Sequence, residues 1–497
     1  MHQRLLTTLV IFALGGVAAS RNLAAQTLSA GELAAVEEWF RRTSTRTVGG
    51  EWGVVIGTMD GRVLWSVDPH RELIPASTVK VFTTGFTRAR AGGGARIATR
   101  VIGRGYLDSL NGRWRGGWQL ELGGDPTLER SGRAGPTLRA LAKQLRDRGI
   151  SVLEGPLMLT SRTGPASSSY PTVWSTDYAG RLYAPPVGPV TLHENTISLK
   201  LKPGRDVGSP PSFVWAYPAG VDRLVRMSAT TVGGTRRRLA LVANSQGGWT
   251  LAGTIGIDSR VAGISAVAHD PVSVLAYAWG SALERAGIRW ENRTAPPAAW
   301  PALPSVLAKV ESPPFDSVAV EINRRSLNIG AELVLQWASA SQTNGPQLLT
   351  QHVRDVVGPQ ARVHLVDGSG LSELDRVSPL TTMLYLARYP QLRGAERFPL
   401  LLPANGVGTL RRLRFGMGRG VVHAKTGTLD RVAALAGYLG RRDGILVISL
   451  MYNGRRVHAA RAAEWELFRL LGAEGVDLTG ALETHMGGGG ATTTEPD

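Results

Sequence analysis

Two short segments of this chain carry a hydroxyl and an amine at spacings suited to acyl-transfer chemistry. Ser77 stands three residues before Lys80 in an apolar setting, and Lys425 opens the triplet Lys425-Thr426-Gly427. Only six of the 56 basic residues are lysine. A lysine amine can lose its proton when it is desolvated, whereas a guanidinium stays charged and cannot act as a base. The retained lysines therefore indicate a chemical role beyond positive charge.

The first segment predicts a nucleophile with an adjacent base. Residues 78–90 have the apolar spacing of a helix, and Pro75 and Ser77 stand at its start, where proline and hydroxyl residues are favoured. Positions i and i+3 share one helix face, so the Lys80 amine can reach the Ser77 hydroxyl. A serine three residues before a lysine is usually a cap or a surface pair, but the apolar surroundings here would bury the amine.

Two further segments could complete a site. Lys425-Thr426-Gly427-Thr428 follows an apolar pair and precedes two predicted strands, so its lysine and hydroxyls could hold a substrate carboxylate, while Gly427 admits close approach to the backbone. Ser326 and Asn328 stand at the start of a predicted helix, between the other two motifs in the sequence. Each segment alone is weak evidence of a catalytic site, but the three segments in this order are a more specific signal than any one of them.

Composition excludes several other chemistries. The 497 residues contain no cysteine, so disulfides, cysteine nucleophiles and cysteine-based zinc sites are impossible. No cofactor or metal is expected. The net charge of +17 would suit an anionic partner, but arginine-rich composition is a simpler explanation. The arginines are scattered apart from one triplet, Arg236 to Arg238, without interleaved aromatic residues, so we expect no nucleic-acid partner.

The two ends have distinct compositions. Residues 1–26 have the basic start, apolar run and small residues of a secretory signal, with cleavage expected between about Ala19 and Gln26. An uncleaved anchor is the alternative, although the run is shorter than the ~20 residues of a membrane span. We therefore expect export across the inner membrane to the periplasm or cell-wall space, with at most peripheral membrane contact. Residues 486–497 are glycine-rich and predicted to be a disordered tail.

The remaining patterns indicate an interrupted α+β domain. Residues 52–58 and 62–66 predict a hairpin around Asp60-Gly61, and strands are expected at 420–426, 432–440 and 444–452. The segment 91–304 is rich in glycine and short β-type runs and ends in a proline-rich stretch. Its predicted helices are 136–148 and 271–287, and those of the flanking segments include 316–324, 328–341 and 457–471.

The three motifs in this order resemble those of β-lactamases and penicillin-binding proteins. Ser77 and Ser326 are 249 residues apart, and this long separation is similar to that of the low-molecular-mass class C penicillin-binding proteins, the D-alanyl-D-alanine carboxypeptidase/endopeptidase family. Further stretches resemble that family across nearly the whole chain: Gly123-Gly124-Asp125-Pro126-Thr127-Leu128, Tyr183-Ala184-Pro185-Pro186, Asp367-Gly368-Ser369-Gly370-Leu371-Ser372 and Gly408-Thr409-Leu410.

The resemblance implies a fold with discontinuous parts. We expect a serine β-lactamase/transpeptidase-like domain of residues 27–90 and 305–485, with an antiparallel sheet between helices. The inserted β-rich segment 91–304 would form one or two further domains.

The resemblance also implies catalytic roles. Ser77 would attack the carbonyl between two D-alanines, and Lys80 would accept its proton. Ser326 would relay a proton to the leaving amine, and Asn328 would bind the substrate amide. Water would then release the acyl-enzyme. In the family the middle residue of this second motif is commonly Asp, and it is Leu327 here.

Binding roles follow in the same way. Lys425 and Thr426 would hold the terminal carboxylate, beside Gly427, and the backbone N–H groups of Ser77 and Thr428 would form the oxyanion hole. Asp177 matches an acidic residue that binds diaminopimelate in some members. The arginine that accompanies it in those members is replaced here by Glu373, so the peptide preference stays open.

The resemblance implies peptidoglycan peptides as substrates and β-lactam antibiotics as covalent inhibitors. A β-lactamase would use the same nucleophile, but it needs a group that rapidly deacylates the penicilloyl-enzyme, and none can be identified. A catalytically silent wall-binding protein is the second alternative. The intact motif residues argue against it.

Overall fold

The computed structural model describes residues 26–132, 135–294, 303–413 and 419–486. The predicted signal, apart from Gln26, and the predicted tail after Met486 lie outside these residues, as does most of the proline-rich stretch before residue 305. No helix in the described part has the length and hydropathy of a membrane span. The helices are α1 Ala30–Arg46, α2 Val79–Ala91, α3 Leu138–Asp147, α4 Pro271–Arg285, α5 Phe315–Arg325, α6 Asn328–Ser339, α7 Gly345–Val357, α8 Pro379–Arg388, α9 Val457–Leu471 and α10 Leu478–Met486.

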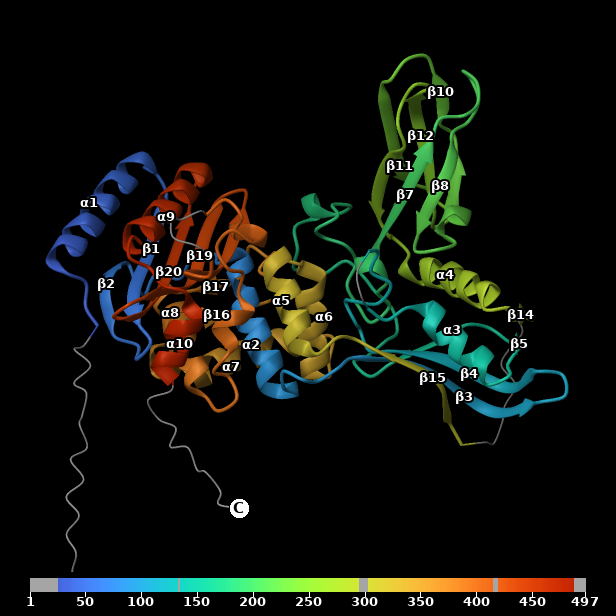
Figure 1. The fold of residues 1–497 in the computed structure, drawn as a ribbon, viewed down its shortest axis with the longest axis horizontal. Helices are drawn as coiled ribbons and strands as arrows, with labels where there is room; N and C mark the ends of the chain where they lie inside the picture. Colours follow the sequence, from blue (N-terminus) through green and yellow to red (C-terminus); the bar gives the residue numbers. More distant parts are fainter. Residues whose placement is uncertain (1–25, 133–134, 295–302, 414–418, 487–497) are drawn as a thin grey trace, which may run out of the picture.

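Strands from both ends of the chain build the sheet of one module. Its order is β18-β19-β20-β1-β2, and every neighbouring pair is antiparallel. The strands are β1 Glu51–Thr58, β2 Val63–Val67, β18 Val422–Leu429, β19 Val432–Arg441 and β20 Gly444–Asn453. The first strand therefore lies beside the last, although some 390 residues separate them in sequence (Figure 1). This module is the predicted catalytic domain.

Helices cover both faces of this sheet because its central strands are apolar on both sides. Val54 and Ile56 of β1 pack with α1 and α9, whereas Val55 between them packs into the opposite core with α2, α5, α6, α7 and α8. β20 alternates in the same way between Ile448 on the first face and Val447 on the second. The predicted transpeptidase-like arrangement, an antiparallel sheet between helices, is confirmed.

Local signals account for the helix starts. Ser29 caps α1 by accepting the Glu32 N–H, and the Glu32 carboxylate accepts the Ser29 N–H in return. Asp270 caps α4, with Pro271 at the first helical position. The expected helices are all present, with ends shifted by a few residues, and the predicted hairpin at Asp60-Gly61 is confirmed.

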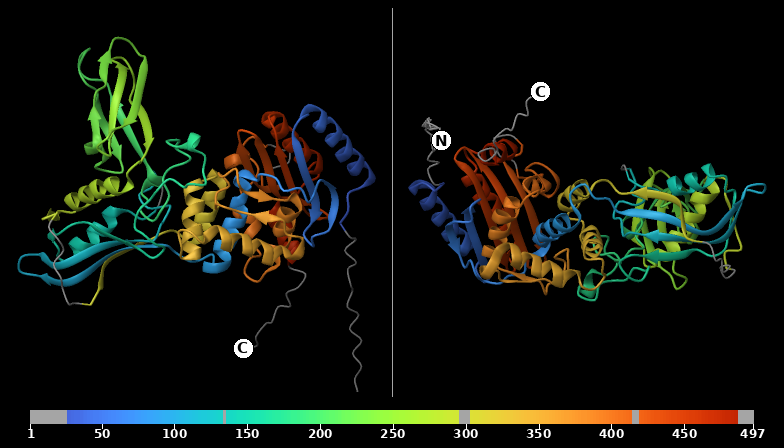
Figure 2. Two further views of the ribbon diagram at one scale, coloured as in Figure 1. Left: turned by 180° about the vertical axis from the view of Figure 1, so that it is seen from behind. Right: turned by 90° about the horizontal axis from the view of Figure 1, so that it is seen from below.

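The insertion forms a second module beside the first (Figures 1 and 2). Its base is a six-stranded sheet of order β14-β5-β4-β3-β15, with β6 paired to β4, and α3 and α4 pack together beside it. The base strands are β3 Ala98–Asp108, β4 Arg113–Leu122, β5 Val152–Glu154, β6 Met158–Ser161, β14 Arg289–Glu291 and β15 Ser305–Glu311.

One predicted boundary is wrong. Residues 305–311 were assigned to the catalytic domain, but they form β15, which pairs antiparallel with β3 from Ser305↔Gly103 to Glu311↔Ala98. The chain therefore returns to the catalytic module after Glu311. The reason is that the outgoing strand β3 needs a partner on its open edge, and the returning strand is in position to supply it.

A distal lobe projects from the base of the insertion (Figure 1). It consists of two small sheets, one of order β13-β7-β8 and one of order β10-β12-β11 with β9 paired to β12. The strands are β7 Thr196–Lys202, β8 Ser212–Tyr217, β9 Val225–Met227, β10 Thr230–Val232, β11 Arg237–Ala243, β12 Trp249–Gly256 and β13 Ala262–Val267.

The segment 162–195 of the insertion lies against the catalytic module. Trp174, Tyr178 and Ala184 form one apolar cluster with Ile329 and Leu333 of α6. The short pair β16 Val363–His364 and β17 Arg376–Val377 frames the loop 365–375 on the catalytic side. These contacts place part of the insertion at the start of α6, where Asn328 stands.

Candidate active site

Ser77 lies in a 3₁₀ turn, Ala76–Thr78, that runs directly into α2. Ala76 before it has φ +47°, a left-handed conformation that costs free energy for a residue with a side chain. Two glycines leave room for this turn. A Cβ at Gly370 would overlap the carbonyl oxygen of Ala76, and one at Gly427 would lie 3.0 Å from the Ser77 nitrogen. The turn is therefore held tightly between the loop 367–372 and strand β18.

Lys80 is fully buried on the first turn of α2 and faces Ser77. Its Nζ lies 2.9 Å from Ser77 Oγ, 2.7 Å from Asn328 Oδ1 and 2.5 Å from the carbonyl oxygen of Ser369. Burial lowers the pKa of Lys80 to about 8, and the nearby carboxylates, Asp367 first, oppose that change. A neutral Lys80 amine is thus accessible near physiological pH and lies within hydrogen-bond distance of the serine hydroxyl.

Asn328 is the first residue of α6, and both the oxygen and the nitrogen of its side-chain amide form hydrogen bonds. Its Oδ1 accepts from Lys80, and its Nδ2 donates to the Tyr183 carbonyl oxygen at 2.8 Å. Tyr183 belongs to the insertion segment that packs on α6, and its ring contacts that of Tyr178 at a centroid distance of 5.8 Å. The insertion therefore fixes the orientation of a side chain in contact with the candidate base.

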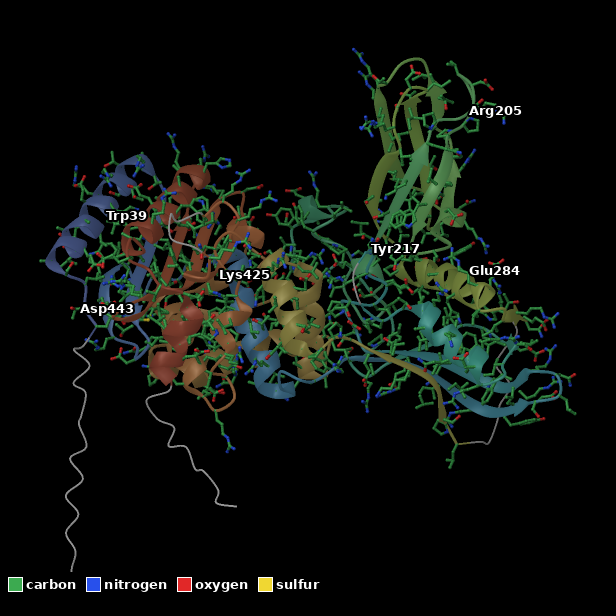
Figure 3. All side chains as sticks on the ribbon, viewed as in Figure 1. Trp39, Arg205, Tyr217, Glu284, Lys425 and Asp443 are labelled. Atoms are coloured by element: carbon green, nitrogen blue, oxygen red, sulfur yellow. The ribbon has the colours of Figure 1, made fainter. Side chains whose placement is uncertain are left out.

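Ser326 and Lys425 form a second serine–lysine pair. Lys425 comes from the edge strand β18, is fully buried, and donates from Nζ to Ser326 Oγ at 2.9 Å and to the Thr426 carbonyl at 2.7 Å. Burial lowers the pKa of Lys425 well below its usual range, and the positive charges of Lys80 and Arg461 act in the same direction. Figure 3 shows Lys425 in the catalytic module, beside α5 and α6.

The position of Ser326 depends on the end of α5. Ser326 has φ +56°, so the chain turns out of the helix there and the hydroxyl points toward β18. The preceding Arg325 binds Glu194 of the insertion with both guanidinium nitrogens, one of them at 2.7 Å. Arg130 contacts the same carboxylate at 3.3 Å. An ion-pair network between the modules therefore anchors the residue before Ser326.

Three carboxyl groups lie behind Lys80, and sequence reasoning assigned no role to any of them. Asp367 accepts the backbone N–H groups of residues 369–372 and the Trp174 indole N–H. Glu332 accepts the Gly368 N–H with both oxygens, and burial raises its pKa. Asp375 is also buried, with a pKa raised well above its usual value. Asp367 thus shapes the loop whose Ser369 carbonyl contacts Lys80.

Arg461 of α9 supports the other side of the site and was also missed. It donates to the Gly427 carbonyl and, at 2.8 Å, to Thr428 Oγ1, and it is paired with the buried Glu464. Thr426 is nearly buried, whereas Thr428 is exposed beyond it. The Arg461 guanidinium therefore holds the backbone of strand β18 at Gly427 and Thr428.

The structure does not bring Asp177 into this constellation. Asp177 is exposed on a short turn, Thr176–Tyr178, and in the described residues its side chain makes no hydrogen bond with the motif residues. The next residue, Tyr178, donates its hydroxyl to Glu373 at 3.2 Å. The two positions singled out for peptide preference are thus neighbours through Tyr178. The other predicted residues form two hydrogen-bonded groups, Ser77 with Lys80 and Asn328, and Ser326 with Lys425.

In the described residues, no group of three or more His, Asp or Glu side chains has the arrangement of a metal site. The chemistry that this centre can perform uses a hydroxyl nucleophile, two lysine amines of lowered pKa and backbone donors. These features and the sheet between helices define a serine enzyme of the β-lactamase/transpeptidase class.

Comparison with known proteins identifies the family. The model of the D-Ala-D-Ala carboxypeptidase 3 (S13) family matches residues 39–471, and the chain belongs to this family. A D-alanyl-D-alanine carboxypeptidase of Actinomadura sp. (strain R39) is 26% identical over 437 residues, which cover 83% of this chain and 79% of that protein. The predicted relationship and the predicted class, a serine-type DD-carboxypeptidase, are confirmed.

Two solved structures share the fold. Penicillin-binding protein 4 from Haemophilus influenzae superimposes with a TM-score of 0.68 at 20% identity, over 86% of this chain and 99% of that chain. The same protein in complex with a β-lactam gives a TM-score of 0.63 at 20% identity and the same coverage. The fold likeness therefore includes the insertion as well as the catalytic module.

Proposed function

We propose that this chain hydrolyses the D-alanyl-D-alanine end of peptidoglycan stem peptides through an acyl-enzyme on Ser77. The observation that carries this assignment is the contact of the buried Lys80 amine with Ser77 Oγ at 2.9 Å. A neutral Lys80 accepts the serine proton as Oγ attacks the carbonyl carbon, and D-alanine leaves as the amine after it gains a proton. Water then attacks the ester, so that the serine hydroxyl is restored.

The second serine–lysine pair supplies the proton for the leaving amine. Ser326 Oγ is bonded to Lys425 Nζ, whose pKa is lowered by burial, so a proton can pass from the amine through the hydroxyl. When the site is occupied, Lys425 and the Thr426 hydroxyl bind the terminal carboxylate of the peptide. The N–H groups of Ser77 and Thr428 form the oxyanion hole, and Asn328 binds the substrate amide.

The acidic pair near Tyr178 bears on peptide preference. Glu373 is exposed, accepts from Tyr178 and lies near the exposed Asp177 turn. Two carboxylates there repel a peptide side chain that ends in a free carboxylate and favour one that ends in an amine or amide. Peptides with amidated diaminopimelate or lysine are therefore preferred over peptides with free diaminopimelate.

The predicted signal supports an exported location, in the periplasm or cell-wall space, where such peptides occur. β-Lactams mimic the D-alanyl-D-alanine end and acylate Ser77. The β-lactam complex of the Haemophilus influenzae protein, which shares the fold, supports this expectation.

The experiment is a direct assay of products. Stem pentapeptides with free and amidated side chains, and their cross-linked dimers, are incubated with the enzyme, and released D-alanine and cleaved dimers are quantified by liquid chromatography. We expect D-alanine release that disappears in Ser77→Ala and is faster with the amidated peptide. Glu373→Arg should reverse the side-chain preference. Absence of cleavage by the folded enzyme would contradict the proposal.

A further inference from the structure

Three loops form the free end of the distal lobe, and backbone hydrogen bonds stabilise their arrangement. The loops are residues 203–211, 233–236 and 257–261, and they meet at the end of the lobe far from the catalytic module. Gly208 and Ser209 exchange backbone hydrogen bonds with Thr231, each at 2.8 Å, and Asp258 N–H bonds to the Gly234 carbonyl at 3.1 Å. Figure 3 shows Arg205 at this end and Tyr217 at the opposite end, near the base.

Five exposed arginines lie at this end of the lobe. We call this end the arginine tip. In the described structure none of them forms an ion pair, and only two acidic residues, Asp206 and Asp258, lie in the same loops. The arginines are Arg205, Arg236, Arg237, Arg238 and Arg260. By contrast, in the base sheet Arg113 contacts both Glu154 and Glu291. The tip therefore carries uncompensated positive charge on a projecting surface.

Two exposed valines lie within the same tip. Val207 is 64% exposed and follows Arg205 by two residues, and Val261 is 48% exposed and follows Arg260 directly. Apolar side chains beside unpaired arginines are the composition of surfaces that dock on an anionic bilayer. The guanidinium groups bind lipid phosphates, and the apolar groups enter the headgroup boundary.

Two simpler explanations account for only part of this arrangement. Arginines on an exposed edge strand prevent pairing with other chains, which would explain Arg237 and Arg238 on β11. Protection of an edge strand does not explain Arg205 and Arg260, which lie in loops. An arginine-rich composition explains how many arginines the chain has. It does not explain why five of them lie together at the end of the distal lobe, with two exposed valines and only two acidic residues.

We propose that the arginine tip docks on an anionic lipid bilayer, so that the enzyme is a peripheral membrane protein in its compartment. The tip lies at the end of the distal lobe, which projects away from the base of the insertion and from the catalytic module (Figures 1 and 2). Contact at this end keeps the catalytic module off the membrane, with its site accessible to peptides in the wall.

The test measures vesicle binding of the exported protein, after its amino terminus has been read by mass spectrometry so that an uncleaved signal cannot bind. The vesicles are phosphatidylcholine with about one third phosphatidylglycerol, beside pure phosphatidylcholine. Arg205, Arg236 and Arg260 are replaced by glutamine in the tip variant. The matched control replaces Arg139, Arg146 and Arg148, three exposed arginines of α3 and its end, and changes the net charge equally.

We expect binding to anionic vesicles only, with loss of most binding at about 1 M NaCl, where the Debye length is about 3 Å. The tip variant should bind about 100-fold more weakly, because each arginine near an anionic surface contributes about fivefold. Val207→Ser should weaken binding about tenfold without changing its salt dependence. Turnover of a soluble D-alanyl-D-alanine peptide should be unchanged in all variants, which shows that they fold.

Three results would overturn the proposal. Absence of binding to anionic vesicles is the first. The second is equal loss in the tip and control variants, which would mean attraction by net charge alone. The third is tighter binding to long-chain polyphosphate than to anionic vesicles, lost in the tip variant, which would make the tip a site for an anionic polymer.

Discussion

Asp367 and Asp375, the two buried aspartates behind Lys80, should lose very different amounts of stability on the same substitution. Asp367 accepts two N–H groups on Oδ1 and three on Oδ2, all from buried donors. Asp375 accepts one, from Val366, and its other oxygen has no donor. Burial raises the pKa of Asp375 well above its usual value, and the charge of Asp367 acts in the same direction, so the neutral acid is favoured at this position.

The expected losses of stability follow from the number of N–H groups that each carboxylate accepts. In Asp367→Asn one oxygen becomes an NH₂ group, so at least two buried N–H donors lose their acceptor, at about 1–3 kcal/mol each. We expect a loss of about 4 kcal/mol of stability, which corresponds to a thermal midpoint about 10 °C lower for a module of this size. In Asp375→Asn the amide oxygen keeps the Val366 bond, and no buried donor loses its acceptor, because the other oxygen of Asp375 has no hydrogen-bond partner in the described residues. The expected loss is below about 1 kcal/mol.

Differential scanning calorimetry of the two variants measures this difference, and the rate of acylation by penicillin measures its effect on the site. Asp367→Asn should also slow acylation, because the loop that places the Ser369 carbonyl against Lys80 loses its central acceptor. Similar midpoints for the two variants, or a larger loss in Asp375→Asn, would show that the hydrogen bonds accepted by Asp367 do not stabilise the protein as expected.

Three further predictions concern the site. The acylation rate should rise with pH and level off above an apparent pKa of about 8, because only the neutral Lys80 amine accepts a proton; Lys80→Arg should lose at least about 1,000-fold in rate at every pH. Gly370→Ala should reduce acylation at least about 100-fold in stopped-flow assays while leaving D-alanyl-D-alanine binding measurable, since the new Cβ overlaps the Ala76 carbonyl and shifts the nucleophile. Arg461→Ala removes the partner of the buried Glu464, whose pKa burial already raises to about 7. A folded-state pKa above the unfolded value means that stability falls as pH rises, so the midpoint of this variant should fall more steeply than that of the parent between about pH 5 and 8.

The contact between Ser77 and Lys80 could be predicted from the sequence because it is local. Ser77 and Lys80 are one helical turn apart, so helix geometry alone predicts their contact, and the unusual retention of lysine marked Lys425 as well. Hydrophobic periodicity was likewise sufficient for most of the helices and for the strands of the central sheet.

The residues that sequence reasoning missed act across long separations. Arg461 reaches Thr428 from another element, and nothing distinguishes it from the many other arginines of the chain. Asp367 lies within a stretch that resembles the family. Its role as the acceptor of several backbone N–H groups arises only because its own loop folds around the carboxylate. The predicted boundary at which the chain returns to the catalytic module was misplaced. The proline-rich stretch marks a break in composition, whereas β15 belongs to the insertion because it pairs with β3. Pairing between distant strands leaves no local pattern.

The most direct test of an acyl-enzyme on Ser77 is the intact mass of the protein after incubation with benzylpenicillin, followed over hours beside Ser77→Ala. We expect a stable increase equal to the mass of one penicillin, located on Ser77 by peptide mapping and absent from the variant. An adduct on another residue, or no adduct with folded protein, would contradict an acyl-enzyme on Ser77. Rapid return to the original mass with hydrolysed penicillin in solution would identify a β-lactamase instead.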